Sequence, residues 1–296
     1  MTANGDDAAI AAEDMERAIN APGPGFLGIL QAAPSNIRQY AYQDREQFLN
    51  IVNHESSNVD GLFLLTGVKN DIFHSTFYIP EDEGPFSTWL AYDAELQLLL
   101  FRMNESPIHS TASPSFQDML HDTLGEMGMA RQLQPVGAAL WQTLTGGKRP
   151  DHAWRPRASW LRNCHGWPNL VLEVALSETQ QKLQSDIRWW LQRSQGQVNN
   201  VTVLGFVITH NAPRITIDKW TNDPNGNARL QQRIIIAKRR GAGEITITGG
   251  PLVIGFESLF ERAPTATEPD VSIDEEKLEF WARGIGGEEE EEEEEP

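Results

Sequence analysis

Hydrophobic and polar residues recur along the first half of this chain with two different periods. Strand-like apolar runs occupy residues 62–65, 75–79, 89–92 and 96–103, and they follow a helix that is predicted over residues 40–52. From residue 113 to about residue 131 the apolar side chains fall at steps of three and four, which predicts a helix that Ser113 or Ser115 caps. This half of the chain is therefore expected to mix strands with helices.

After Gly147 the pattern becomes strand, helix, strand. Residues 168–175 form a short, β-branched, apolar run of the kind that is buried in a sheet. A helix is predicted over residues 177–194 and a second buried strand over residues 201–209, followed by shorter strands at 214–220, 229–237 and 244–248. The order indicates an α/β (α+β) fold with a central mixed sheet flanked by helices.

Three segments are expected. Residues 1–40 read as a peripheral N-terminal extension, because Pro and Gly at positions 22–25 interrupt any helix there. Residues 41–263 read as one domain, with a core at about 85–260. Residues 264–296 read as an acidic, largely disordered tail with one short helix at 273–283, since the glutamate run at 288–295 repels itself.

Composition narrows the class of protein. The single cysteine, Cys164, excludes an internal disulfide framework and a cysteine-based zinc site. There is no apolar run of 18 residues and no signal-peptide pattern at the start, so we expect an intracellular protein of the nucleus or cytoplasm with no membrane partner.

Charge is distributed unevenly along the chain. The formal net charge is −18, yet residues 148–240 hold 15 Lys and Arg against 6 Asp and Glu, while the other residues hold 9 basic and 36 acidic side chains. Such asymmetry often accompanies a surface that faces phosphates, which makes DNA a candidate partner; the alternative is that these cations are ordinary surface residues of strands and helices.

Glu173 is the most informative residue of the sequence. It interrupts an otherwise apolar strand, where an ionised carboxylate is costly unless a metal, a cation or hydrogen bonds compensate it. Asp151 directly follows Pro150 and precedes Glu173 by 22 residues. Side-chain alternation places Glu173 and Ala175 on the same face of the strand. Two carboxylates on neighbouring strands are what Mg²⁺-dependent hydrolysis requires.

The Pro-Asp pair at 150–151, the apolar strand with Glu173 and the helix after it resemble the PD-(D/E)XK, or restriction endonuclease-like, nuclease superfamily. More narrowly, residues 148–151, 167–173 and 177–191 are similar to uncharacterised fungal members. The resemblance covers roughly residues 85–260. It implies a helix before a mixed central sheet, with Asp151 and Glu173 as catalytic acids and metal ligands.

One position departs from the family pattern, which has Lys two residues after the glutamate where this chain has Ala175. Some members supply the lysine from the next helix, and the resemblance then implies Lys182, with Gln181 as its neighbouring alternative. An acid from the leading helix often joins such sites. Glu126 is the first candidate for it, and Asp122 and Asp118 on the same helix are its rivals.

The resemblance implies a metal-dependent nuclease that uses Mg²⁺ or Mn²⁺ and acts on DNA. The cations expected to hold nucleic acid are Lys148, Arg149, Arg155, Arg157 and Arg188. The alternative is a catalytically inactive relative that binds nucleic acid or protein, with Ala175 as the sign of lost activity. An unrelated small-molecule enzyme also stays open.

Individual residues have simpler readings as well. A buried arginine such as Arg155 or Arg188 could hold Glu173 without a metal, and Lys182 could pair with Asp186 one helical turn later. The three histidines His109, His152 and His165 lack the spacing of metal ligands, so we predict no metal role for them.

Overall fold

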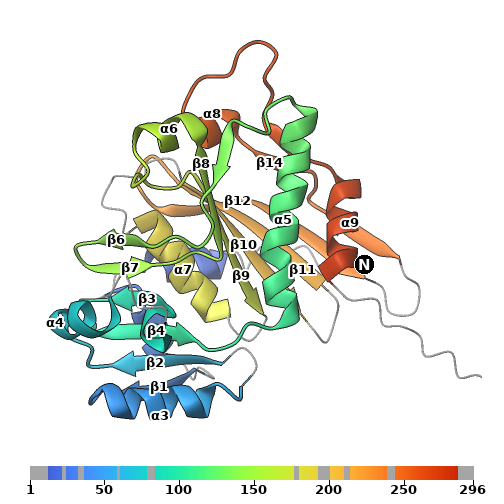
Figure 1. Cartoon of the computed structure of the whole chain (residues 1–296). Coiled ribbons are helices and arrows are strands. Elements are labelled where there is room, and N and C mark those ends of the chain that lie inside the picture. The colour runs from blue at the N-terminus through green and yellow to red at the C-terminus, as the bar shows by residue number, and fades with distance from the viewer. Residues whose placement is uncertain are drawn as a thin grey trace, which may run out of the picture.

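A computed structural model describes residues 13–21, 25–32, 37–58, 61–78, 84–176, 180–192, 201–209, 214–238 and 244–285. Two mixed sheets, a two-stranded antiparallel sheet and the helices that cover them make up the described part of the molecule (Figure 1). This confirms the predicted α+β class with a mixed sheet flanked by helices. No helix in the described ranges is both long and apolar enough to cross a membrane.

The larger sheet has seven strands in the order β13-β12-β11-β10-β9-β8-β5. Its strands are β5 (Leu133–Pro135), β8 (His152–Pro156), β9 (Leu170–Leu176), β10 (Thr202–Thr209), β11 (Arg214–Asn222), β12 (Ala228–Lys238) and β13 (Ile245–Thr248). Neighbours are antiparallel except β9 and β10, which are parallel. The chain reaches β10 through helix α7 (Gln180–Gln192), because parallel neighbours need a crossover connection.

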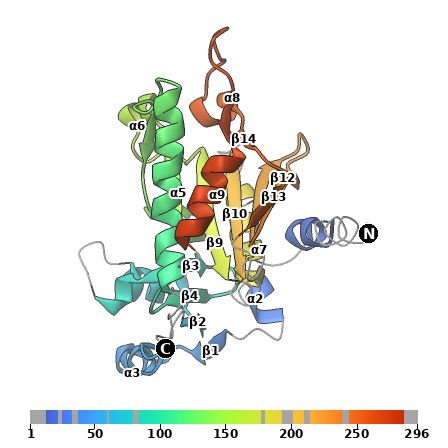
Figure 2. The ribbon, with the colours of Figure 1, turned by 90° about the vertical axis from the view of Figure 1, so that its right-hand side faces the viewer.

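Helices cover both faces of this sheet (Figure 2). On one face lie α5 (Pro107–Glu126) and α9 (Glu275–Ile285), which pack on the even-numbered apolar residues of β9 and β10. On the other face α7 packs on Val171 and Ala175. Helix α5 begins six residues earlier than predicted, because Ser106 caps it by accepting a hydrogen bond from the His109 amide at 3.2 Å.

The smaller sheet has six strands in the order β1-β2-β4-β3-β7-β6. They are β1 (Arg38–Ala41), β2 (Leu62–Thr66), β3 (Trp89–Asp93), β4 (Leu98–Arg102), β6 (Trp141–Thr143) and β7 (Gly146–Lys148). Phenylalanines on its outer face pack under α3 (Arg45–Glu55), while Leu64 and Leu100 on the inner face share a core with α7. Helix α7 therefore lies between the two sheets.

Short elements complete the fold. They are α2 (Gly28–Ala32), α4 (Asn70–Ile72), a π-helix (Phe73–Phe77), a 3-10 helix (Pro85–Ser87), α6 (Arg157–Arg162), α8 (Phe256–Phe260), β14 (Leu252–Ile254) and β15 (Val271–Ile273). The strand that was predicted at residues 75–79 is wrong for the described part of that range, which belongs to the π-helix and the residue after it. Phe73 and Phe77 of this helix pack on the small sheet. The apolar residues of this segment were therefore mistaken for those of a buried strand.

The segments predicted to be peripheral contribute to the core instead. Met15, Ile19 and Phe26 of the N-terminal extension are at most 2% exposed and pack in the core that contains α7. In the C-terminal segment, β15 and α9 are ordered, and Trp281 is 3% exposed. The helix predicted at 273–283 is therefore confirmed as α9, whereas the expectation of disorder is wrong up to residue 285. The glutamate run lies outside the described residues.

Candidate functional site

Asp151 and Glu173 lie side by side at the junction of the two sheets. In the antiparallel pair of β8 and β9, His152 is opposite Leu172, so one further step along the register places Asp151 beside Glu173. The backbone amide of Val174 donates to Asp151 Oδ2 at 2.7 Å, which holds this carboxyl against β9. Glu173 points to the α7 face of the sheet, as its neighbours Val171 and Ala175 do.

Asp151 lies beside two cations, one at the end of β4 and one in the first turn of α5. Arg102 Nη1, at the end of β4, lies 3.3 Å from Asp151 Oδ1, and His109 Nε2 lies 3.4 Å from Asp151 Oδ2. Burial opposes ionisation of Asp151, but the charges of His109, Lys182 and Arg102 outweigh it and hold the pKa of this carboxyl well below its usual range. The ionised form of the Asp151 carboxyl is thus the favoured one.

His109 is correspondingly stabilised as a cation. Its burial would lower its pKa, but the Asp151 carboxylate and a hydrogen bond with Glu105 raise the pKa of His109 to about 9. Glu105 Oε2 lies 3.9 Å from His109 Nδ1, and its side chain is half exposed at 49%. At neutral pH His109 therefore carries a proton and a positive charge.

Glu173 is completely buried and is held by a lysine of the other sheet. Lys148 Nζ, at the end of β7, lies 3.1 Å from Glu173 Oε1, and Trp190 Nε1 on α7 donates to the same oxygen at 2.5 Å. Burial and the nearby Asp186 carboxylate raise the pKa of Glu173 to about 7, against the opposing charges of Lys148 and Lys182. Ionisation of this carboxyl thus depends on the lysines.

Two lysines and two carboxyls close a ring at this point. Lys148 Nζ also lies 2.7 Å from Asp186 Oδ1, and Lys182 Nζ lies 2.7 Å from Asp186 Oδ2 and 3.7 Å from Glu173 Oε2. All four side chains are at most 2% exposed. Burial would raise the pKa of Asp186, but the two lysines lower it. The pairing of Lys182 with Asp186 along α7, one of the two readings of Lys182, is present.

These side chains form one buried charge cluster, which we define as Arg102, His109, Lys148, Asp151, Glu173, Lys182 and Asp186. Its three carboxyls are matched by Lys148, Lys182 and Arg102, and His109 is balanced by Glu105 nearby. A buried ionic group is tolerated when partners of opposite charge and hydrogen bonds compensate its lost hydration. In this cluster the protein's own side chains provide that compensation.

A divalent cation does not fit this arrangement. Mg²⁺ requires oxygen ligands at about 2.0–2.1 Å in near-octahedral geometry. Both oxygens of Asp151 and one of Glu173 already have donors, and the ammonium of Lys148 lies between Glu173 and Asp186. Within the described ranges, no group of three or more His, Cys, Asp or Glu is placed to hold a metal ion. We therefore derive no catalytic step through a metal.

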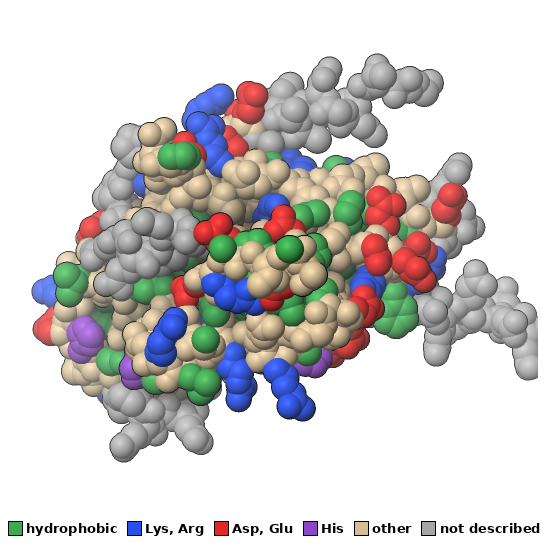
Figure 3. Space-filling model, turned by 90° about the horizontal axis from the view of Figure 1, so that it is seen from above, with side chains coloured by type: hydrophobic (Ala, Val, Ile, Leu, Met, Phe, Trp, Pro, Cys, Tyr) green, Lys and Arg blue, Asp and Glu red, His purple; other side chains and the backbone are tan. Residues whose placement is uncertain are grey.

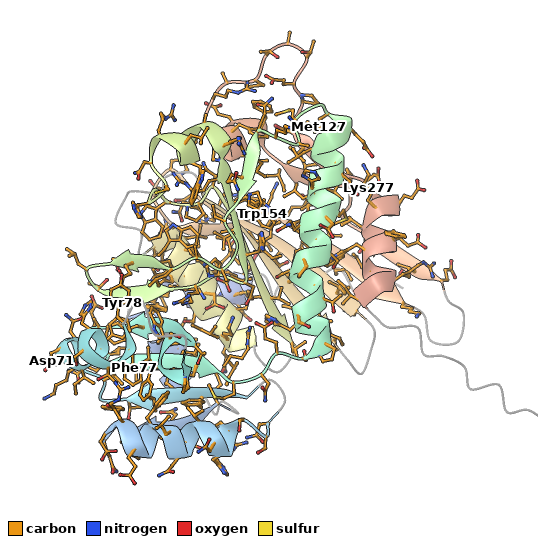
Figure 4. All side chains as sticks on the ribbon, in the orientation of Figure 1. Asp71, Phe77, Tyr78, Met127, Trp154 and Lys277 are labelled. Atoms are coloured by element: carbon orange, nitrogen blue, oxygen red, sulfur yellow. The ribbon has the colours of Figure 1, made fainter. Side chains whose placement is uncertain are left out.

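The acid that was expected from the leading helix lies elsewhere. Glu126 is near the far end of α5, 17 residues after His109, and it pairs with Lys277 of α9 at 2.5 Å. Figure 4 shows Lys277 beside Met127, at the end of α5 away from the small sheet. Asp118 and Asp122 are exposed, and Gln181 is half-buried. The residues of α5 and its approach that reach the cluster are instead His109 and Arg102.

The cations that were expected to hold nucleic acid are mostly inside the protein. Lys148, Arg155 and Arg188 are 1%, 4% and 7% exposed. Arg155 donates to the Asn163 carbonyl at 2.6 Å and Arg188 to the Ala21 carbonyl at 2.8 Å, so neither arginine holds Glu173. Arg149 is half-buried beside the Trp89 ring, which leaves only Arg157 well exposed.

Sequence reasoning missed Arg102 and gave Lys148 a different role. The sequence held a signal for Arg102, because this residue directly follows the apolar run of residues 98–101, and in the structure it is only 8% exposed. Lys148 offered no comparable signal, since a lysine after two glycines is an ordinary turn residue. Asp186 was recognised only as a partner of Lys182, although its place on the buried face of α7 marks it as the second acid of the ring.

Comparisons with known proteins do not identify a family for this chain. A scan against family models gives no match, and neither does a search of curated proteins. Among solved structures, a candidate nuclease belonging to DUF820 from Anabaena variabilis matches with a TM-score of 0.37 and 12% identity, covering 69% of this chain and 95% of that chain. A similarity of this size is too low to assign an activity.

Proposed function

We propose that this chain is a nuclease-fold protein that does not cleave phosphodiesters and that acts as a binding module. One observation carries the proposal: Lys148 places an ammonium group 3.1 Å from Glu173 and 2.7 Å from Asp186, between carboxyls that a metal-dependent enzyme would keep for its ion. Ala175, in the position where the family has its lysine, supports the same conclusion.

The burial of the charge cluster supports this proposal independently. Hydrolysis needs the scissile phosphate and an attacking water to reach the acids. Glu173 and Asp186 are 0% exposed, Trp190 donates to Glu173, and Trp141 packs against the Trp190 ring. A substrate would therefore have to separate α7 from the small sheet before it could contact Glu173.

A metal-dependent nuclease is the second candidate, and the convergence of Asp151, Glu173 and Lys182 favours it. Glu173 Oε2 is buried and accepts no hydrogen bond from the described residues, which leaves one lone-pair direction for a cation. In this case Asp151 and Glu173 would hold Mg²⁺ or Mn²⁺ after Lys148 withdraws, and Lys182 would face the transferred phosphoryl group. The enzyme would then require an open conformation.

Plasmid nicking distinguishes the two candidates. Supercoiled DNA is incubated with the wild-type protein and with Asp151→Asn and Glu173→Gln, in Mg²⁺ and separately in Mn²⁺. The binding-module proposal predicts the same background rate for all three preparations. Nicking by the wild-type protein that both substitutions abolish, in variants that remain folded by circular dichroism, would establish the nuclease and refute the proposal.

DNA is the partner that we propose for the module. Lys148, Arg155, Lys182 and Arg188 are buried, so the proposal rests on the exposed cations of residues 148–240, such as Arg157, Arg162 and Arg214. On the face that Figure 3 presents, Lys and Arg side chains are spread among Asp and Glu side chains. Binding is therefore expected to be weak and strongly salt-dependent. Fluorescence anisotropy with labelled duplex DNA at increasing salt measures it, and an affinity that does not change with salt would argue against a phosphate-facing surface.

A further inference from the structure

A small cavity opens where β10, β11, β12 and β13 end, on the face of the sheet that α5 and α9 cover. It has a volume of about 110 Å³. The row Ile208, Ile215 and Ile236 forms its floor, because these residues are paired across three neighbouring strands. None of the residues of the charge cluster lines this cavity, although Ile108, which does, directly precedes His109 in α5.

Aliphatic side chains of the helices form the walls. Ile108 comes from the first turn of α5, and Ala282 and Ile285 come from the last turns of α9. Ile245 of β13 also lines the cavity and is only partly buried. An apolar cavity that is open to solvent favours an aliphatic ligand, since each methylene transferred from water into it contributes favourably.

Two cations stand at the mouth of this cavity. Arg214 begins β11 and Lys238 ends β12, and both line the opening. Within the described ranges, neither side chain takes part in an ion pair or a side-chain hydrogen bond. This contrasts with Arg233 on the same strand β12, whose guanidinium makes two hydrogen bonds of 2.7 Å to Asp218. The two cations at the mouth are thus available to an anion.

We propose that this cavity binds a short aliphatic carboxylate, with the alkyl chain among the isoleucines and the carboxylate at Arg214 and Lys238. The volume sets the length, because sites for drug-sized ligands measure about 300–1,000 Å³. A cavity of about 110 Å³ therefore suits a chain of about four to eight carbons and excludes a long acyl chain. The inference does not depend on whether the charge cluster is catalytic.

Isoleucine methyl resonances give a direct readout, since six isoleucines line the cavity: Ile108, Ile208, Ile215, Ile236, Ile245 and Ile285. The full-length protein is labelled at isoleucine methyl groups and titrated with butanoate, hexanoate and hexanol. We expect saturable shifts of these methyls and about fourfold tighter binding for each added methylene until the cavity is full. Hexanol should bind about fivefold more weakly than hexanoate, because it lacks the charge.

Two variants test the two halves of the site. The double substitution Arg214→Gln with Lys238→Gln should weaken hexanoate to the level of hexanol, and Ala282→Phe should abolish the binding of both by filling the cavity. The charge-matched control Arg131→Gln with Lys69→Gln, at positions outside the cavity, should bind as the wild type does. Thermal unfolding confirms that each variant is folded.

Three results would overturn the proposal. The first is the absence of saturable methyl shifts with hexanoate up to millimolar concentrations. The second is equal affinity of the wild-type protein for hexanoate and hexanol, which would leave the cations without a role. The third is undiminished hexanoate binding in a folded Ala282→Phe protein, which would place the ligand elsewhere.

Discussion

Lys148 and Glu173 show how a single pair of side chains can decide between two readings of a sequence motif. An acid in an apolar strand requires compensation, and the sequence leaves open whether a metal or a cationic side chain provides it. In the fold, an ammonium from a different sheet lies 3.1 Å from the acid. The residue that answers the question thus comes from 25 positions earlier, on another element, and no local pattern identifies it.

Replacing Lys148 by Met should destabilise the protein strongly. The methionine fills a similar volume, but it leaves Glu173 and Asp186 without one of their two lysines, and removing one partner of a buried ion pair costs about 3–5 kcal/mol. Urea unfolding measures the change. Lys277→Met is the matched control, because its pair with Glu126 is on the surface and should cost no more than about 1 kcal/mol. Equal effects of the two substitutions would show that the charge cluster is not stabilising.

His109 should make stability depend on pH. Its pKa is about 9 in the folded protein, above the ordinary value of 6.5, so its contribution is fully present below pH 6.5 and is lost as the pH rises through 9. The stability advantage of wild type over His109→Gln should therefore shrink across this window by up to ~3 kcal/mol. Urea unfolding at several pH values tests this, with exposed His165→Gln as the control. Parallel profiles for wild type and His109→Gln would contradict the assigned ion pair.

At the scale of elements, the core around β9, α7 and β10 is where sequence and structure agree best. Its two strands are mostly apolar, with Glu173 as the exception in β9, and its helix has a regular apolar face, so that local periodicity and tertiary burial coincide. The predictions of secondary structure and of burial failed where the local periodicity of the sequence does not match the burial of the side chains. Phe73 and Phe77 lie in a π-helix, and Phe26 is buried although Pro and Gly residues precede it. Long-range packing, which no short window reports, determines these segments.

Helix α9 offers a test of its place in the core. Trp281 is 3% exposed and packs against Phe206 and Phe116, while its neighbour Phe280 is 81% exposed. Trp281→Ala should cost about 3–5 kcal/mol in unfolding free energy. Phe280→Ala should change it by less than about 0.5 kcal/mol, because it removes no buried contact. Similar losses for both substitutions would mean that α9 does not pack as described.

At the scale of the whole molecule, the charge cluster joins two sheets that the sequence presents as one succession of strands. Its residues span positions 102 to 186 and come from β4, β7, β9, the helices α5 and α7, and Asp151 directly before β8. The sequence predicted the mixed sheet and its flanking helices, and it singled out Asp151, Glu173 and Lys182 as residues of one site. It could not predict the second sheet as a separate layer, because pairing between distant strands leaves no local signature.

This arrangement gives the motif residues a structural role across the molecule. Arg102 and Lys148 belong to the small sheet, whereas Glu173 belongs to the large one, so the ion pairs of the cluster cross the boundary between the sheets. Because the cluster is balanced internally, adding a divalent cation would require breaking the contacts of Lys148. The central claim is therefore that the site is already filled by the protein's own cations.

Isothermal titration calorimetry of Mg²⁺ into the wild-type protein at neutral pH, repeated with Mn²⁺, tests this claim most directly. The account predicts no saturable heat beyond that of Glu173→Gln, since the cations of the cluster leave no vacant set of oxygen ligands. Stoichiometric binding by the wild-type protein that Glu173→Gln and Asp151→Asn both abolish would contradict it, and would show that the two acids form a metal site.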